Sequence, residues 1–308
     1  MASVMQAQST ADPIAEVLEG FGARHAAFDD VFFKFNLPEV GMALLVDMMV
    51  RRRHRRRVVE VRACLYTKDG ATIAVAHYPL STLKREREGA ITLANTWLAP
   101  GGARGAVGEI SWDLVFQAHG PLLDPQVGGA IRPFDLRLRS VPDVLISGNV
   151  RVARHGYTFS HESGTVGTSY GRRLPDSWYW VSSNTFKDPG VAFECMIMES
   201  RVFGLPFLRA RVGYFYLHTA TTTLTVLHPL TGQVRLVGDR TQFRVTARHR
   251  HEPPIIVQCS APETRYHDLG DRIYTTLLGT CEIEGLTSAD GTAGLAEREP
   301  LRHGTVRK

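Results

Sequence analysis

Residues 170–186 read YGRRLPDSWYWVSSNTF and contain two of the chain's four tryptophans, Trp178 and Trp180. Side chains alternate between the two faces of a β-strand, so both indoles share one face, which Asn184 and Phe186 continue. A face with two indoles, an amide and a phenyl ring is typical of a pocket wall for a large apolar molecule. It is equally typical of the packed core of a small barrel. We therefore take Trp178, Trp180, Asn184 and Phe186 as candidate substrate-binding residues.

The rest of the chain consists mainly of short alternating segments separated by turn residues. Clear examples are residues 42–50, 58–66, 109–118 and 242–248. Strands at this density predict an all-β fold built from barrels or sandwiches. The exception is one short helix near the N-terminus, where Asp12-Pro13 precedes an apolar pattern that ends at Gly20.

Proline and glycine cluster between Gly120 and Phe134, and Pro142 and Gly148 follow. Such a cluster predicts a domain boundary. We expect a segment with the short helix at 1–20, a β domain at 21–147, a second β domain at 148–290 and a flexible polar tail at 291–308.

The net charge of +5 comes from one segment. Residues 51–57 contain six arginines, and subtracting these six positive charges from +5 leaves −1. The run lies between two apolar strands, where it would form a solvated hairpin tip. The charge therefore predicts no nucleic-acid partner.

The cysteines Cys64, Cys195, Cys259 and Cys281 lie in apolar or alternating segments, which is typical of buried reduced thiols. The N-terminus has no apolar signal segment, and Asp47 interrupts the longest apolar run. We expect a cytoplasmic protein without stable membrane insertion. The sequence predicts no particular oligomeric state.

Four elements of the central stretch resemble the signature of the tocopherol cyclase and hydroxyneurosporene synthase (carotenoid hydratase) superfamily. They are Tyr170-Gly171, Leu174-Pro175, Trp178-Tyr179-Trp180 and Asn184-Thr185-Phe186, in this order and spacing. Residues 111–114 and 281–285 also resemble strands of that family. The resemblance implies two lipocalin-like β domains in tandem, no cofactor, and a hydrophobic small-molecule substrate. Family members include cyclases, hydratases and the decalin-forming Diels-Alderases of polyketide pathways.

The segments where these relatives keep their acids differ in this chain. Carotenoid hydratases carry an Asp-His pair before an acidic residue, Trp and Gly, whereas residues 160–164 read Ser-His-Glu-Ser-Gly. Tocopherol cyclases tend to have Glu-Lys-Asn before Trp-Gly, whereas residues 167–171 read Gly-Thr-Ser-Tyr-Gly. His161 and Glu162 remain the best acid/base candidates, because a histidine near neutrality can exchange a proton with a polyene or enol. The alternative is a solvated loop.

Tyrosine hydroxyls are the other candidates. Tyr170 lies close to His161 in sequence, and Tyr214 shares a strand face with Tyr216, from which hydroxyls could polarise a carbonyl. We take Tyr170 and Tyr214 as candidate catalytic residues, and Tyr216 and Trp112 as candidate substrate-binding residues. Each could instead be a packing residue. No metal is expected, and no nucleotide-binding or serine-hydrolase motif is present.

The leading functional hypothesis is a cofactor-independent cyclase or isomerase of natural-product biosynthesis. It would fold an apolar polyene for an intramolecular 4+2 cycloaddition, which is catalysis by orientation. A second hypothesis is a proton-initiated cyclase or hydratase of an isoprenoid, with Glu162 or Glu194 kept protonated by an apolar wall. The third is a lipocalin-like carrier without catalysis. A buried polar group directed into the cavity would favour an enzyme over a carrier.

Overall fold

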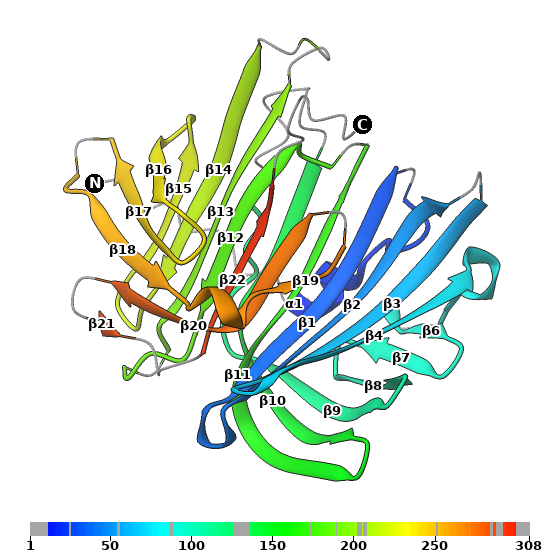
Figure 1. Cartoon of the computed structure of the whole chain (residues 1–308). Helices are drawn as coiled ribbons and strands as arrows, with labels where there is room; N and C mark the ends of the chain where they lie inside the picture. Colours follow the sequence, from blue (N-terminus) through cyan, green and yellow to red (C-terminus); the bar gives the residue numbers. More distant parts are fainter. Residues whose placement is uncertain are drawn as a thin grey trace, which may run out of the picture.

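The computed structural model describes residues 12–24, 26–53, 56–86, 89–125, 136–172, 174–188, 190–201, 205, 208–250, 252–270, 272–283, 286–287 and 292–299. Within these residues the chain forms two antiparallel sheets, each curled towards a barrel, and one α-helix, α1 (Pro13–Leu18) (Figure 1). Short 3-10 helices span Pro38–Val40, Leu80–Thr82 and Glu263–Arg265. The predicted fold class, all-β with two lipocalin-like barrels in tandem, is confirmed.

The first sheet has the strand order β4-β3-β2-β1-β11-β10-β9-β8-β7-β6-β5. Its strands are β1 (Phe28–Leu37), β2 (Met42–Arg53), β3 (Arg56–Thr67), β4 (Gly70–Pro79), β5 (Lys84–Arg85), β6 (Ile91–Leu93), β7 (Thr96–Ala99), β8 (Gly102–Val107), β9 (Ile110–Ala118), β10 (Leu136–Val152) and β11 (His155–Gly171). The sheet curls until β3 and β4 contact β8.

The second sheet has the strand order β15-β14-β13-β12-β22-β20-β18-β17-β16, with β19 and β21 paired to β20. Its strands are β12 (Ser177–Ser183), β13 (Ala192–Arg201), β14 (Arg209–His218), β15 (Thr223–His228), β16 (Gly232–Gly238), β17 (Gln242–His249), β18 (Ile255–Ser260), β19 (His267–Asp268), β20 (Ile273–Ile283), β21 (Leu286–Thr287) and β22 (Ala293–Arg298). Here β15 contacts β16, so this sheet also curls on itself.

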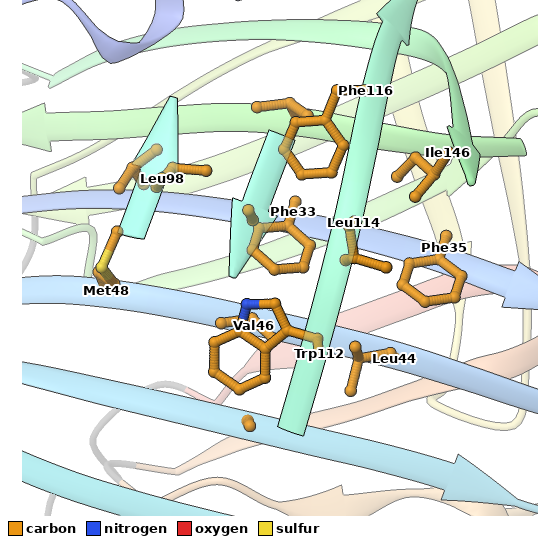
Figure 2. Packing of buried hydrophobic residues seen from close by; sticks show 14 of the residues in the cluster. Phe33, Phe35, Leu44, Val46, Met48, Leu98, Trp112, Leu114, Phe116 and Ile146 are labelled. Atoms are coloured by element: carbon orange, nitrogen blue, oxygen red, sulfur yellow. The ribbon is translucent and has the colours of Figure 1, made fainter. Parts of the chain in front are cut away.

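Each sheet encloses its own apolar core, because alternate residues of every strand point inward. Figure 2 shows part of the first core, where Phe33 of β1 packs against Trp112 and Phe116 of β9. A separate cluster around Phe193, which includes three of the buried cysteines, fills the second barrel. All four cysteines are free and buried, as predicted.

Strand β1 is buried on both faces. Its Phe33 and Phe35 belong to the first core, while the opposite face, with Phe32, Lys34 and Asn36, meets the second sheet. A strand covered on both sides is expected to be continuously apolar. The charged residues of β1 are therefore the exception to explain.

The sheets divide at a different place from the predicted domain boundary. Position 147 lies inside β10, which pairs with β9 and β11 of the first sheet. The change of sheet falls between Gly171 and Ser177. Pro142 and Gly148 lie at two register shifts of β10, where the pairing with β11 is irregular. They therefore mark bulges within one strand and not the end of a domain.

The predicted chain ends agree in part with the structure. Helix α1 is confirmed, with the Asp12 carboxylate accepting a hydrogen bond from the Ile14 amide. The tail predicted at 291–308 needs correction, because β22 (Ala293–Arg298) lies between β12 and β20. Within that tail, positions 291 and 300–308 lie outside the described residues. In the described part of the chain, no helix is long and apolar enough to cross a membrane.

Candidate active site between the two sheets

A cavity lies between the two sheets, with walls from both. Its volume is about 180 Å³. A buried water needs roughly 10–15 Å³, so the cavity can hold an organic ligand. Most of its wall is apolar, and the main apolar residues are Phe28, Phe32, Leu45, Met49, Leu136, Leu138, Leu174, Trp178, Trp180, Met196, Leu269 and Ile273.

Glu194 of β13 is the buried acid of this cavity. It is 2% exposed. The Tyr214 hydroxyl donates a hydrogen bond to Oε1, and the Ser140 hydroxyl, from the first sheet, donates to Oε2 at 3.1 Å. Burial raises the pKa of Glu194, although the bonds from Tyr214 and Ser140 and the positive charge of Lys34 oppose the rise. The carboxyl group is therefore held in fixed geometry with its protonated form favoured.

Two further carboxyl groups line the cavity from the first sheet. Asp30 lies on β1, and its Oδ1 accepts hydrogen bonds from the Ser169 amide and hydroxyl, both at 2.6 Å. Burial raises the pKa of Asp30 to about 7, and the neighbouring Asp47 carboxylate adds to the rise. A carboxyl group with this pKa can act as either acid or base near neutral pH.

Asp47 belongs to a charged cluster at the edge of the cavity. The Arg62 Nε lies 3.8 Å from Asp47 Oδ2, and Arg62 Nη2 donates to Glu60 Oε1 at 2.7 Å. Arg51 and His77 also contact the Glu60 carboxylate. Burial raises the pKa of Asp47, against the attraction of Arg62. The partners of Glu60 saturate its carboxylate, and Glu60 does not line the cavity. Asp30, with its pKa near 7, is therefore the carboxyl group on this side that is suited to proton exchange.

The raised pKa of Asp30 gives a stability prediction for Asp30→Asn. Between pH 3.8 and about 7 the Asp30 carboxyl group stays protonated in the folded protein but is ionised in the unfolded chain. The free energy of unfolding of the wild type therefore falls as the pH rises through this range. Asparagine has no such proton and keeps an oxygen for Ser169. We expect the variant to melt at least roughly 3 °C above wild type near pH 8 and within about 1 °C near pH 4. Thermal unfolding across this range, with the exposed Asp188→Asn as control, measures the difference. A difference independent of pH would contradict the assignment.

Three of the residues predicted from sequence meet in this cavity. Trp178 and Trp180 line it side by side on β12, as the alternation predicts, and Tyr214 binds Glu194. The Phe32 ring contacts Trp180 edge-on, with centroids 6.2 Å apart and an interplanar angle of 82°. Glu194, a candidate acid of the proton-initiated hypothesis, lies among them.

Asn184 and Phe186, predicted to continue the tryptophan face, do not line the cavity. The Asn184 side-chain amide donates to the backbone carbonyls of Pro142 (2.9 Å) and Gly164 (2.6 Å), so it joins the two sheets and does not line the cavity. Phe186 packs in the second core. Strand β12 ends at Ser183, so alternation no longer fixes the direction of either side chain.

Tyr216 and Trp112 also lie outside the cavity wall. Tyr216 stands directly opposite Glu194 in the β13–β14 ladder and is buried beside it. Trp112 packs in the first core, with its ring 6.2 Å from Phe33 and tilted by 66°.

His161, Glu162 and Tyr170 follow one another along β11 but contribute nothing to the cavity wall. His161 is exposed, has a φ of 60° and contacts the Ser160 hydroxyl at 2.7 Å. Partial burial, and then Glu39, raise the pKa of Glu162. Tyr170 stacks under the guanidinium of Arg24, 3.8 Å from the ring centroid. The lining residues of β11 are Thr168 and Ser169.

Sequence reasoning did not identify Asp30, Lys34 or Ser140. A signal existed, because Lys34 and Asp47 are isolated charges in apolar segments and Asp30 belongs to an Asp-Asp pair at the start of the first of these segments. Buried charges are costly and are kept where they are paired or used. Their convergence with Glu194 depends on the packing of the two sheets, which the sequence pattern does not show.

Other proteins with solved structures share this fold. One is a candidate AttH from Nitrosomonas europaea, with a TM-score of 0.65 and 12% identity over 96% of this chain and 97% of that chain. Another is kievitone hydratase from Nectria haematococca, with a TM-score of 0.57 and 12% identity over 95% of each chain. No family model matches the chain, and no curated protein does. At 12% identity, the likeness establishes a common fold along nearly the whole chain.

Proposed function

We propose that the protein is a cofactor-independent hydratase or cyclase, which protonates a carbon–carbon double bond of a mostly apolar substrate. The observation that carries the proposal is the Glu194 carboxyl group, buried at an apolar cavity and held by Tyr214 and Ser140. Protonation of an alkene needs a carboxylic acid that remains protonated near neutral pH, and burial favours that form.

The proposed reaction has two steps. Glu194 transfers its proton to one alkene carbon, which leaves a carbocation beside the electron-rich faces of Trp178 and Trp180. Water, or a nucleophile within the substrate, then bonds to the cationic carbon and releases a proton to the Asp30 carboxylate. With water the product is an alcohol, and with an internal nucleophile it is a ring. Exchange with solvent returns Glu194 to the acid form and Asp30 to the carboxylate.

Two features favour this function over the alternatives. A 4+2 cycloaddition needs a shaped cavity but no acid, whereas this cavity has carboxyl groups from both sheets. A carrier gains nothing from buried carboxyl groups at the ligand, because they oppose the binding of apolar surface. One of the solved structures with the same fold is named as a kievitone hydratase, which fits the proposal.

The proposal is tested by the fate of solvent hydrogen. Purified protein is incubated in D2O with a panel of prenylated phenols and linear polyenes, and products are analysed by mass spectrometry. We expect a product with one deuterium bound to carbon, since the transferred proton comes from solvent-exchanged Glu194. A cyclic product without deuterium would replace the proposal by a cycloaddition. Tight binding without any product across the panel would replace it by a carrier.

A further inference from the structure

Lys34 is the least expected charge in the molecule. It lies on the β1 face that meets the second sheet, and its side chain has no solvent exposure. Its Nζ has no hydrogen-bond partner in the described part of the chain. The ring centroid of Trp180 lies 5.8 Å from Nζ. An ammonium group buried without hydrogen bonds is strongly unfavourable for folding, so its presence calls for a compensating role.

Glu194 is the group that Lys34 acts on. The two residues approach the same indole from opposite sheets. The Nζ of Lys34 lies 5.8 Å from the ring centroid of Trp180, and Glu194 pairs with Ser182, which is two residues further along β12 on the face that carries Trp180. At this separation each charge affects the pKa of the other group. Burial lowers the pKa of Lys34 to about 8, while the Glu194 carboxylate opposes that fall. Near neutral pH the lysine is therefore mainly cationic, and its field favours the ionised form of Glu194.

The other groups around Glu194 remain uncharged. Tyr214 and Tyr216 face it from β14, and Cys195 follows it on β13. Burial raises the pKa of all three, so they do not ionise near neutral pH. Ser140 and Ser182, from β10 and β12, do not titrate; Ser182 stands opposite Glu194 in the ladder. The cavity that Glu194 lines has further charged side chains on its other walls, namely Asp30, Asp47, Arg51, Arg62, Arg139 and Arg298. Lys34 is the one whose charge shifts the pKa of Glu194.

We infer that Lys34 is a positioning residue that sets the acid strength of Glu194 from the opposite sheet. The inference rests on the proposed function for its purpose. Burial alone would make Glu194 too weak an acid to protonate an alkene. The lysine charge offsets part of this effect and stabilises the carboxylate that forms when the proton leaves. The domain interface thereby becomes part of the catalytic machinery, since the acid and its regulator come from different sheets.

The test is the pH titration of Glu194 in Lys34→Met. Methionine keeps the unbranched shape and removes the charge. In infrared spectra, the carbonyl band of the protonated Glu194 side chain is identified by its loss in Glu194→Gln. We expect its titration midpoint to lie about one pH unit or more higher in Lys34→Met than in wild type. Lys187→Met, which removes an exposed lysine, is expected to leave the midpoint unchanged.

Activity and stability provide a second readout. With an accepted substrate, Lys34→Met should reduce kcat about tenfold and move the alkaline limb of the pH profile upward, while its melting temperature equals or exceeds that of wild type. Lys34→Arg keeps the charge, so the alkaline limb of its pH profile should lie at the same pH as in the wild type. If an arginine cannot be accommodated, the reciprocal measurement is lysine NMR, where Glu194→Gln should lower the pKa of the Lys34 amine.

The outcomes separate this inference from the proposed function. An identical Glu194 midpoint in wild type and Lys34→Met would overturn the role of Lys34 and leave the proposed function standing. A shifted midpoint, together with no deuterium in any product, would overturn the proposed function and keep the electrostatic link between the sheets.

Discussion

Glu194→Gln is expected to reduce turnover of any accepted substrate by a factor of about 10²–10⁴, the usual contribution of a positioned general acid. Glutamine has nearly the same shape and keeps an oxygen that can accept the hydrogen bond from Tyr214. It cannot transfer a proton at neutral pH. The loss should therefore appear in kcat, while KM changes little, because the apolar wall that binds the substrate is unaltered.

The matched control is Glu199→Gln on the same strand. Glu199 binds Arg209 and Arg211 near the surface and does not line the cavity, so its replacement should leave turnover unchanged. Binding is followed by quenching of tryptophan fluorescence, since Trp178 and Trp180 form the wall. If Glu194→Gln retains both binding and full turnover, Glu194 is not the acid. The cycloaddition hypothesis, which needs no acid, would then be favoured.

The local pattern was sufficient to predict the β architecture, but not the site as a whole. Alternation along 178–181 correctly predicts that both indoles share one face, because the periodicity of a strand is a property of the backbone. The strand segments at 42–50 and 58–66 likewise appear within β2 and β3. The prediction that 51–57 forms a solvated hairpin tip needs correction, because both strands continue into the arginine run and Arg51 binds Glu60 at the edge of the cavity. Residues 91–99 form two short strands, β6 and β7, with Ala94 at a φ of 52° in the turn between them.

Contacts between distant segments were not predictable from such patterns. Asp30 and Glu194 line one cavity because β1 pairs with β11 and because the two sheets pack face to face. The pairing of strands far apart in sequence depends on the closure of the whole sheet. For the same reason the domain boundary was misplaced, since proline and glycine mark a strand bulge as well as a linker.

Trp112→Ala tests whether that tryptophan is a core or a binding residue, and it should cause the largest loss of stability among the aromatic variants. Trp112 is 3% exposed and lies opposite Gly105, where any Cβ would come within 2.7 Å of the indole. The ring therefore lies against bare backbone on one side and Phe33 on the other, so its removal leaves a large cavity. Removing a buried tryptophan costs about 3–5 kcal/mol, which corresponds to a fall in melting temperature of roughly 10 °C.

The same substitution at Trp178 provides the comparison. Trp178 is only half-buried and faces the open cavity, so Trp178→Ala removes fewer packing contacts. We expect Trp178→Ala to lower the melting temperature by less than half as much as Trp112→Ala, while weakening the binding of an apolar ligand. Thermal unfolding and ligand titration of both variants separate the two roles. If Trp112→Ala kept the wild-type melting temperature and lost ligand binding, Trp112 would be a binding residue. The interior of the first barrel, and not the space between the sheets, would then be the place to look for the substrate.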